Sequence, residues 1–346
     1  AATMRSRIER WCAINSGSHH RRGIERFAEA ALEAFEPLDA RVRRVSLPAF
    51  ASVDDCGEPT TFETANALVL RKRPDAPRQV LLAIHLDTVY PETSAFQTVT
   101  RLDERTLRGP GVADAKGGLA LLATALEAFE GSPAADSLGW TVVLNPDEEI
   151  GSPCSMGLLA EAAAGADFGL VFEPCLPDGS MISRRKGSGN FAIVVRGRAA
   201  HVGRHFAEGR SAIHALASIV DEVAGWNASL PGVVANTGLV TGGGALNVVP
   251  AFALARLNLR VEDRAQQEEA RRRLAALCER VGREREVEVE VSGDFLSPPK
   301  TIDARMEALM GEVERAGKEV GAEIDWRPSG GVCDGNKLAA AGLPNV

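Results

Sequence analysis

The chain has 346 residues, of which 45% are hydrophobic and 25% are charged, as is usual for a soluble globular protein. At this length we expect two domains rather than one. The formal net charge of −8 argues against a general nucleic-acid binder, which would carry a basic stripe. No apolar run approaches the roughly 20 residues that span a bilayer, so neither nucleic acid nor membrane is expected as a partner.

The six cysteines are scattered and form no C-x-x-C pair, which argues against a zinc ribbon and against a dense disulfide framework. A reduced, cytoplasmic protein is therefore the default expectation. Because the sequence begins at Ala1 rather than at a methionine, an exported form with a removed signal peptide is left open.

Several metal-ligating side chains in the first half of the chain each follow a short apolar run: His85 and Asp87, Asp114, Glu148 and Glu149, and Glu173. Such runs, bounded by turn residues, are typical of buried strands in a parallel sheet. Open α/β sheets bind ligands at the carboxyl ends of their strands. One imidazole and several carboxylates are therefore expected to converge in one crevice, as in a two-metal hydrolase.

Residues 116–130 carry apolar side chains at helical spacing, so a helix is expected directly after the Asp114 loop. The N-terminus of such a helix favours nearby anions, including a carboxylate ligand or a substrate. Together with strands that end near His85, Asn145 and Phe172, this helix predicts an α/β catalytic domain.

The pattern changes near Arg184. From there the sequence predicts, in order, a strand at 190–197, a helix at 211–226 capped by Ser211, a short strand at 237–241, a strand at 252–261, a helix at 264–281 and a strand around 287–291. This order, βαββαβ, is that of a ferredoxin-like module. We therefore predict a catalytic domain made of residues 1–183 and 293–346, interrupted by an inserted domain of residues 184–292. Residues 295–299 are expected to be the return linker, followed by a helix at 303–320.

Four segments resemble the M20 family of zinc amidohydrolases, most closely its carboxypeptidase G2-like, glutamate carboxypeptidase branch. They are HLDTVYP at 85–91, RGPGVADAKGG at 108–118, PDEEIGS at 146–152 and GRAAHVG at 197–203. The resemblance runs in register from about Ile14 to Val346. It implies a zinc-exopeptidase-like catalytic domain whose inserted ferredoxin-like domain serves as a lid and as the interface of a homodimer.

The resemblance also implies a metal-ligand set with two zinc ions per subunit, or cobalt or manganese in their place. Asp114 would bridge the two ions, His85 and Glu173 would bind one of them, and Glu149 would bind the other. Carboxylates and imidazole suit these metals, which activate water and polarise a carbonyl.

Two further residues, Glu148 and His201, take catalytic roles by the same resemblance. Glu148 would be the general acid/base that takes a proton from water and passes it to the leaving amine. Asp87, by its position two residues after His85, fits an acceptor that fixes the tautomer of the ligating imidazole, with a turn-forming residue before Thr88 as the alternative. His201, far from the other residues in sequence, would reach the partner subunit's site and stabilise the oxyanion, which makes dimerisation part of catalysis.

Asn247 and Arg260 are the candidate substrate-binding residues. Arg260 lies on the polar face of the alternating strand 252–261, where a guanidinium can clamp a carboxylate. The resemblance implies that this pair grips the substrate's free α-carboxylate. The segment GGVCDG at 330–335 resembles the family's Gly-Gly-x-Ser-Asp substrate loop, with Cys333 in place of serine.

The leading hypothesis is therefore a zinc hydrolase that releases a C-terminal amino acid, such as glutamate, from a small N-acyl or peptidyl substrate. An N-acyl-amino-acid deacylase or a dipeptidase of the same mechanism is the first alternative. The resemblance also implies a Gly-rich loop beyond Val346 whose histidine completes the second zinc site, and we expect such a tail. Without it, an inactive zinc-binding scaffold homodimer is the second alternative, although a scaffold needs neither Glu148 nor His201.

Overall fold

The structure is a computed structural model that describes residues 2–346. At the centre of its larger lobe is a five-stranded sheet in the order β1-β4-β8-β5-β9. The strands are β1 (Arg41–Val45), β4 (Ala67–Lys72), β8 (Gly139–Asn145), β5 (Gln79–His85) and β9 (Phe168–Val171). The strands β5, β8 and β9 run parallel to one another, whereas β4 runs opposite to its neighbours.

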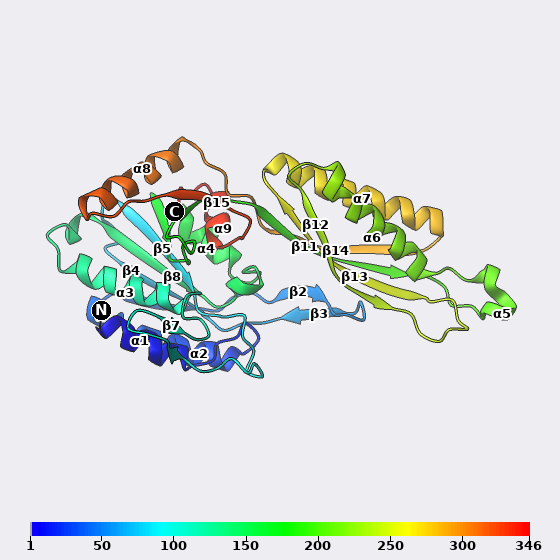
Figure 1. The fold of residues 1–346 in the computed structure, drawn as a ribbon, viewed down its shortest axis with the longest axis horizontal. Helices are drawn as coiled ribbons and strands as arrows, with labels where there is room; N and C mark the ends of the chain where they lie inside the picture. The colour runs from blue at the N-terminus through cyan, green and yellow to red at the C-terminus, as the bar shows by residue number, and fades with distance from the viewer. Residues whose placement is uncertain (1) are drawn as a thin grey trace.

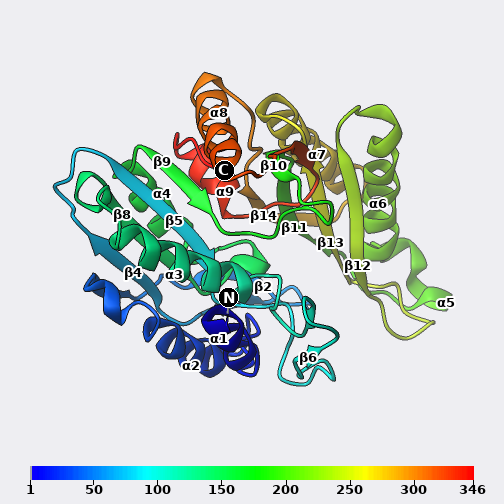
Figure 2. The ribbon, with the colours of Figure 1, turned by 60° about the vertical axis from the view of Figure 1, so that its left-hand side comes forward.

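Helices cover both faces of this sheet, as the continuous apolar runs predict for buried strands (Figure 2). On one face lie α1 (Ala2–Cys12), α2 (Arg21–Leu32) and α3 (Lys116–Glu130), and on the other lie α4 (Met156–Ala164), α9 (Asp334–Ala340) and α8 (Ala304–Glu319). Successive strand residues alternate between two apolar clusters: Leu82 and Ile84 face Leu119, whereas Leu81 and Ala83 face Leu159. The fold is therefore of the α/β class.

The smaller lobe is a four-stranded antiparallel sheet in the order β12-β13-β11-β14 with two helices on one face (Figure 1). Its elements are β11 (Gly187–Arg196), α6 (Ala212–Ser229), β12 (Val234–Gly242), β13 (Phe252–Val261), α7 (Arg264–Arg285) and β14 (Glu288–Ser297). This is the predicted βαββαβ order, and Ser211 caps α6 by accepting a hydrogen bond from the backbone N–H of His214. The domain boundaries themselves stay a prediction.

Short elements connect and flank the two lobes. They are β2 (Phe50–Val53), β3 (Pro59–Phe62), β6 (Thr100–Arg101), β7 (Leu107–Arg108), β10 (Met181–Arg185), β15 (Trp326–Ser329), α5 (Val202–His205) and the 3-10 turns Glu36–Leu38, Ala135–Ser137, Glu148–Ile150 and Phe206–Glu208. Within residues 2–346, no helix is both long enough and apolar enough to cross a membrane.

One predicted boundary is wrong. Residues 295–297 were expected in a linker, but they complete β14, which pairs with β11 as far as Ser297. The reason is packing, because the Phe295 ring is buried edge-on against Phe191 with centroids 5.6 Å apart. The prolines that follow Ser297 end the strand.

Candidate metal centre

The parallel strands β5, β8 and β9 end at the same edge of the larger sheet and bring most of the predicted ligands together. His85 is the last residue of β5, the 3-10 turn Glu148–Ile150 follows β8, and Glu173 follows β9. Asp114 differs from the prediction, since it lies in the turn before α3 rather than at the exit of a strand. The helix start thus supplies the carboxylate that faces the strand ends.

The buried imidazole of His85 is the central group of this site. Its Nε2 lies 3.0 Å from Asp114 Oδ1 and 3.8 Å from Glu173 Oε1. Its Nδ1 lies 3.0 Å from the backbone carbonyl oxygen of Asp87 and 3.3 Å from the Oδ1 of the same residue. The nearer acceptor for the second ring nitrogen is thus a backbone oxygen, with the predicted carboxylate beside it.

Two overlapping sets of side chains could each hold a cation. One contains His85, Glu148 and Glu173, the other contains His85, Asp114 and Glu149, and within each set the ligand atoms lie within 4.8 Å of one another. Imidazole and carboxylate donors suit zinc. The donor types present therefore fit zinc, with one imidazole and several carboxylates available to it. Glu148, expected as the acid/base, belongs to the first of these sets, although Asp114 and Glu173 lie nearer to the imidazole.

Burial and mutual repulsion shift the protonation of these carboxylates. Burial, aided by neighbouring carboxylates, raises the pKa of Glu149 to about 7 and the pKa of Glu173 to about 7. Burial also raises the pKa of Glu148 well above its usual range. Asp114 differs because the hydrogen bond with His85 lowers its pKa. Carboxylates crowded in this way stabilise a cation, since a bound metal displaces the protons that they otherwise retain.

The carboxylate of Asp87 fixes the turn that carries the two adjacent glutamates. Its Oδ1 accepts a hydrogen bond from the backbone N–H of Glu148 at 3.0 Å, and its Oδ2 accepts one from the backbone N–H of Glu149 at 3.1 Å. The hydroxyl of Ser18 also donates to Oδ2, at 2.7 Å. Since Asp87 is buried, this contact rigidly joins the end of β5 to the turn after β8.

Asp334 also supports this turn; it lies in the segment 330–335 that resembles the substrate loop, but the sequence alone assigned it no role of its own. Its Oδ2 accepts a hydrogen bond from Asn145 Nδ2 at 2.7 Å, and its Oδ1 accepts one from the hydroxyl of Ser152. Lys337 Nζ lies 3.2 Å from Asp334 Oδ1, and both side chains are buried. The signal for this ion pair was the aspartate of that motif followed by a lysine one helical turn later.

His201 and Asn247 lie together at the tip of the smaller lobe, beside α5 and away from the ends of β5 and β8 (Figure 1). His201 forms an isolated β-bridge with Val248, and the backbone carbonyl of Asn247 accepts a hydrogen bond from Val202 N–H at 2.9 Å. Both His201 and Asn247 are exposed. The structure therefore does not bring either residue to the metal centre of its own chain.

Arg260 lies at the other end of β13 from the loop that holds Asn247. Its Nε donates to Asn258 Oδ1 at 2.9 Å, and its Nη1 donates to the backbone carbonyl of Gly330 in the larger lobe at 3.4 Å. Within one chain the two predicted carboxylate-binding residues are therefore apart. The predicted strand at 252–261 already separates the two, because Asn247 precedes its first residue and Arg260 lies near its last.

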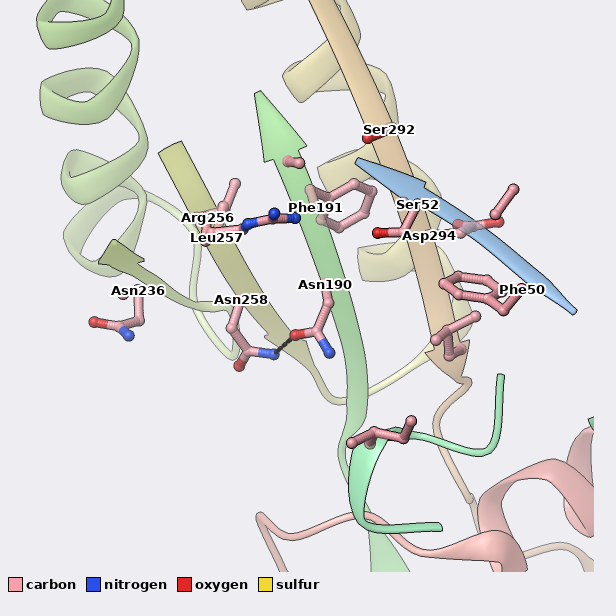
Figure 3. Close-up of a pocket in the computed structure, with 16 residues that line it drawn as sticks. Phe50, Ser52, Asn190, Phe191, Asn236, Arg256, Leu257, Asn258, Ser292 and Asp294 are labelled. Atoms are coloured by element: carbon pink, nitrogen blue, oxygen red, sulfur yellow. Dashed lines mark hydrogen bonds between the residues drawn. The ribbon is translucent and has the colours of Figure 1, made fainter. Parts of the chain in front are cut away.

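A groove of about 300 Å³ lies on the face of the smaller sheet that the helices leave open (Figure 3). In it Asn258 Nδ2 donates to Asn190 Oδ1 at 2.7 Å, and Arg256 reaches the β2–β3 hairpin through Val53 O at 2.6 Å and Asp55 Oδ1 at 3.0 Å. Its lining includes none of the candidate metal ligands. The groove reaches the turn that carries the two glutamates only through Ile150.

Comparison with known proteins places this geometry in a family. The family described as "Peptidase family M20/M25/M40" matches residues 81–346. The chain belongs to the M20 family. M20 proteins are metal-dependent peptidases and amidohydrolases, so the chain is a hydrolase of this kind, as the four sequence segments predicted.

Two curated relatives are each 29% identical to this chain over the aligned residues. Carboxypeptidase G2 of Pseudomonas sp. strain RS-16 is 29% identical over 206 residues, which cover 55% of this chain and 49% of that enzyme. Succinyl-diaminopimelate desuccinylase of Novosphingobium aromaticivorans is 29% identical over 299 residues, covering 82% of this chain and 76% of that enzyme. The M20 metallo-carboxypeptidase Sso-CP2 of Sulfolobus solfataricus has a similar fold, with a TM-score of 0.73, 15% identity and coverage of 99% of this chain and 90% of that one.

Proposed function

We propose that this chain is a two-zinc hydrolase that cleaves an amide or peptide bond in a small N-acyl amino acid or peptide and releases a C-terminal amino acid. One observation carries the proposal: two overlapping clusters of ligand atoms, His85 with Glu148 and Glu173, and His85 with Asp114 and Glu149, lie at one edge of a parallel sheet. Because one imidazole nitrogen binds only one ion, the carboxylates would have to hold the second ion of a two-metal site.

The residues of the chain divide the work of hydrolysis between them. Zinc supplies Lewis acidity, which activates water and polarises the scissile carbonyl. Glu148 takes the proton from the attacking water and passes it to the leaving amine, a role favoured by a pKa raised through burial. Asp87 holds the backbone of Glu148 in place, so that proton transfer begins from a fixed geometry.

A homodimer completes the site in this proposal. The strand β12 is at the edge of its sheet, and its free backbone groups offer a pairing surface for a second copy. Large apolar side chains are exposed on the same lobe, including Val240 at 57%, Phe206 at 63% and Leu246 at 101% relative exposure. A second copy that covers them would stabilise an assembly, and in this proposal the exposed His201 serves the other subunit.

A deacylase is the second candidate function. The observation that favours it is the succinyl-diaminopimelate desuccinylase name, which several relatives carry, whereas carboxypeptidase G2 is the name that favours the first candidate. The chemistry at the metal centre is the same in both. The two candidates differ in the part of the substrate that is recognised: a carboxypeptidase recognises the amino acid that it releases, whereas a deacylase recognises the acyl group.

A substrate panel tests the proposal. N-acyl amino acids, including N-succinyl compounds, and α- and γ-glutamyl amino acids would be offered to zinc-loaded protein while release of the free amine is measured. We expect at least one class to be hydrolysed, with activity lost on chelation and restored by zinc. Turnover that chelation leaves unchanged, or none for any substrate at full zinc occupancy, would reject the proposed function.

A further inference from the structure

A small pocket beside the metal centre contains two cationic side chains that none of the roles above uses. Its lining includes Glu173, Arg185, Lys300 and Cys333, and its volume is about 50 Å³. A volume of this size admits one small polar group rather than a whole side chain. Because Glu173 belongs both to this pocket and to the metal-binding set, the pocket opens beside the candidate metals.

Backbone pairing fixes the two cations side by side. Arg185 and Lys300 form an isolated antiparallel β-bridge, in which each backbone N–H donates to the other residue's carbonyl at 3.0 Å. Residues that pair directly in an antiparallel ladder project their side chains to the same face, with Cβ atoms roughly 5.5 Å apart. The guanidinium and the ammonium therefore start from neighbouring positions on one side of the chain.

The two cations are only partly compensated by Glu173, which lines the same pocket and is assigned to a metal. Lys300 is only 3% exposed, and like charges directly opposite each other destabilise a strand pair. Within residues 2–346, no carboxylate forms an ion pair with either side chain; the Arg185 guanidinium instead donates to the backbone carbonyl of Gly331 at 3.3 Å. Burial lowers the pKa of Lys300 to about 8, so the ammonium is still mostly protonated at neutral pH.

The Gly330–Gly331 segment links this pocket to Arg260. The Arg260 guanidinium donates to the carbonyl of Gly330 at 3.4 Å, next to the carbonyl that Arg185 contacts. Two guanidinium groups thus flank one short loop, one from the end of β10 and one from β13. A substrate with a carboxylate at each of two positions would meet a cation at both.

We propose that Lys300 and Arg185 form a subsite for a second carboxylate of the substrate, distinct from the α-carboxylate assigned to Arg260. The inference rests on the proposed hydrolase function and deepens it, because it restricts the preferred substrates to dicarboxylic compounds. The second carboxylate is carried by the acyl chain or by the side chain of the released amino acid.

Two matched substrate pairs test this subsite in the zinc-loaded protein. One pair differs at the end of the acyl chain, N-succinyl against N-succinamyl, and the other differs at the released residue, glutamate against glutamine. We expect the wild type to prefer the acid in one pair, and Lys300→Met to lower that preference, measured as a ratio of kcat/KM values, by about 10- to 100-fold. Lys300→Arg should restore most of the preference, and Lys318→Met, at an exposed position on α8, should leave the ratio unchanged.

Several outcomes would overturn the subsite. A Lys300→Met variant that loses activity equally on acid and amide substrates shows a structural role, and one that keeps the wild-type ratio shows that Lys300 does not contact substrate. Calorimetry with glutarate and with sulfate separates a carboxylate subsite from a general anion site: glutarate binding that Lys300→Met weakens supports the proposal, whereas equal binding of the two anions contradicts it. If the wild type hydrolyses nothing while Lys300-dependent glutarate binding persists, the proposed function fails but the subsite stands.

Discussion

The carboxylate of Asp87 accepts a hydrogen bond from the backbone N–H of Glu148 at 3.0 Å. The same carboxylate holds the next N–H in the chain, and the backbone carbonyl of Asp87 faces the ring of His85. One buried residue therefore sets both the imidazole and the turn that carries the acid/base. Its contribution is geometric, since it touches neither the substrate nor a metal in the proposed mechanism.

Asp87→Asn should lower kcat and weaken metal binding together. In the wild type both carboxylate oxygens of Asp87 accept a backbone N–H. The asparagine keeps one acceptor oxygen, but its NH₂ group would meet the other N–H donor, so we expect the turn to shift. We expect losses of about 10- to 100-fold in metal affinity, the usual scale for residues that orient ligands. Metal titration and steady-state kinetics measure both effects. Asp75→Asn, at an exposed position, is the control, and wild-type values for Asp87→Asn would remove the positioning role.

Arg260→Ala should raise KM for substrates with a free α-carboxylate far more than for their amidated analogues, because the charge-assisted contact is lost only where a carboxylate exists. Arg256→Ala is a suitable control, since Arg256 lies on the same face of β13 but binds Asp55 of the hairpin. That control should affect both substrates alike. If Arg260→Ala raises KM equally for both kinds of substrate, the role of Arg260 is to hold the loop at Gly330.

His201→Ala should reduce kcat by about 10²- to 10³-fold, the cost of removing one oxyanion donor, without changing zinc content. A mixed dimer of one His201→Ala chain and one Glu148→Gln chain tests the shared site, because one of its two sites then keeps both residues. We expect activity from the mixture that neither parent shows. Activity unchanged in His201→Ala alone, or an inactive but verified mixed dimer, would argue against action across subunits. His205→Ala, at the last residue of the short helix that His201 caps, controls for local disturbance.

Chelator-treated protein should lose stability as the pH rises from about 4.5 to about 7. Burial raises the pKa of Glu149 and of Glu173 to about 7, above the value of 4.5 expected in the unfolded chain. The folded state therefore binds more protons than the unfolded state in this window, and its free energy of unfolding falls with increasing pH. The midpoint of thermal unfolding, measured in chelator at pH 5 and at pH 7.5, tests this trend. In a separate sample with saturating zinc and no chelator, the midpoint should fall less with pH. A midpoint that rises with pH would contradict these shifts.

The sequence predicted best those features that repeat locally. The helix at 116–130 and the strand at 252–261 have the predicted bounds, because apolar side chains at a fixed spacing determine which face is buried. The strand ends carrying His85 and Glu173 could be expected to meet, since parallel strands share an edge.

Features that depend on contacts between distant segments could not be predicted in this way. Lys300 follows two prolines and resembles a linker residue in sequence, yet its pairing with Arg185 buries it beside the metal centre. The ion pair of Asp334 with Lys337 is local, but its hydrogen bond to Asn145 joins segments far apart in the chain. Neither contact can be read from a repeating pattern in the sequence, because each involves one polar side chain and one distant partner.

The pair Glu148 and Glu149 offers the most direct test of the proposed mechanism, since the two are adjacent and are assigned different roles. Kinetics and elemental analysis of Glu148→Gln and Glu149→Gln, after reconstitution with zinc, form one measurement. Glu148→Gln should lose about 10²- to 10⁴-fold in kcat with zinc content close to that of the wild type, because a proton acceptor is removed and no assigned ligand is lost. Glu149→Gln should be depleted of zinc. Wild-type turnover in Glu148→Gln, or zinc loss in Glu148→Gln with full zinc in Glu149→Gln, would contradict the assignment of the acid/base.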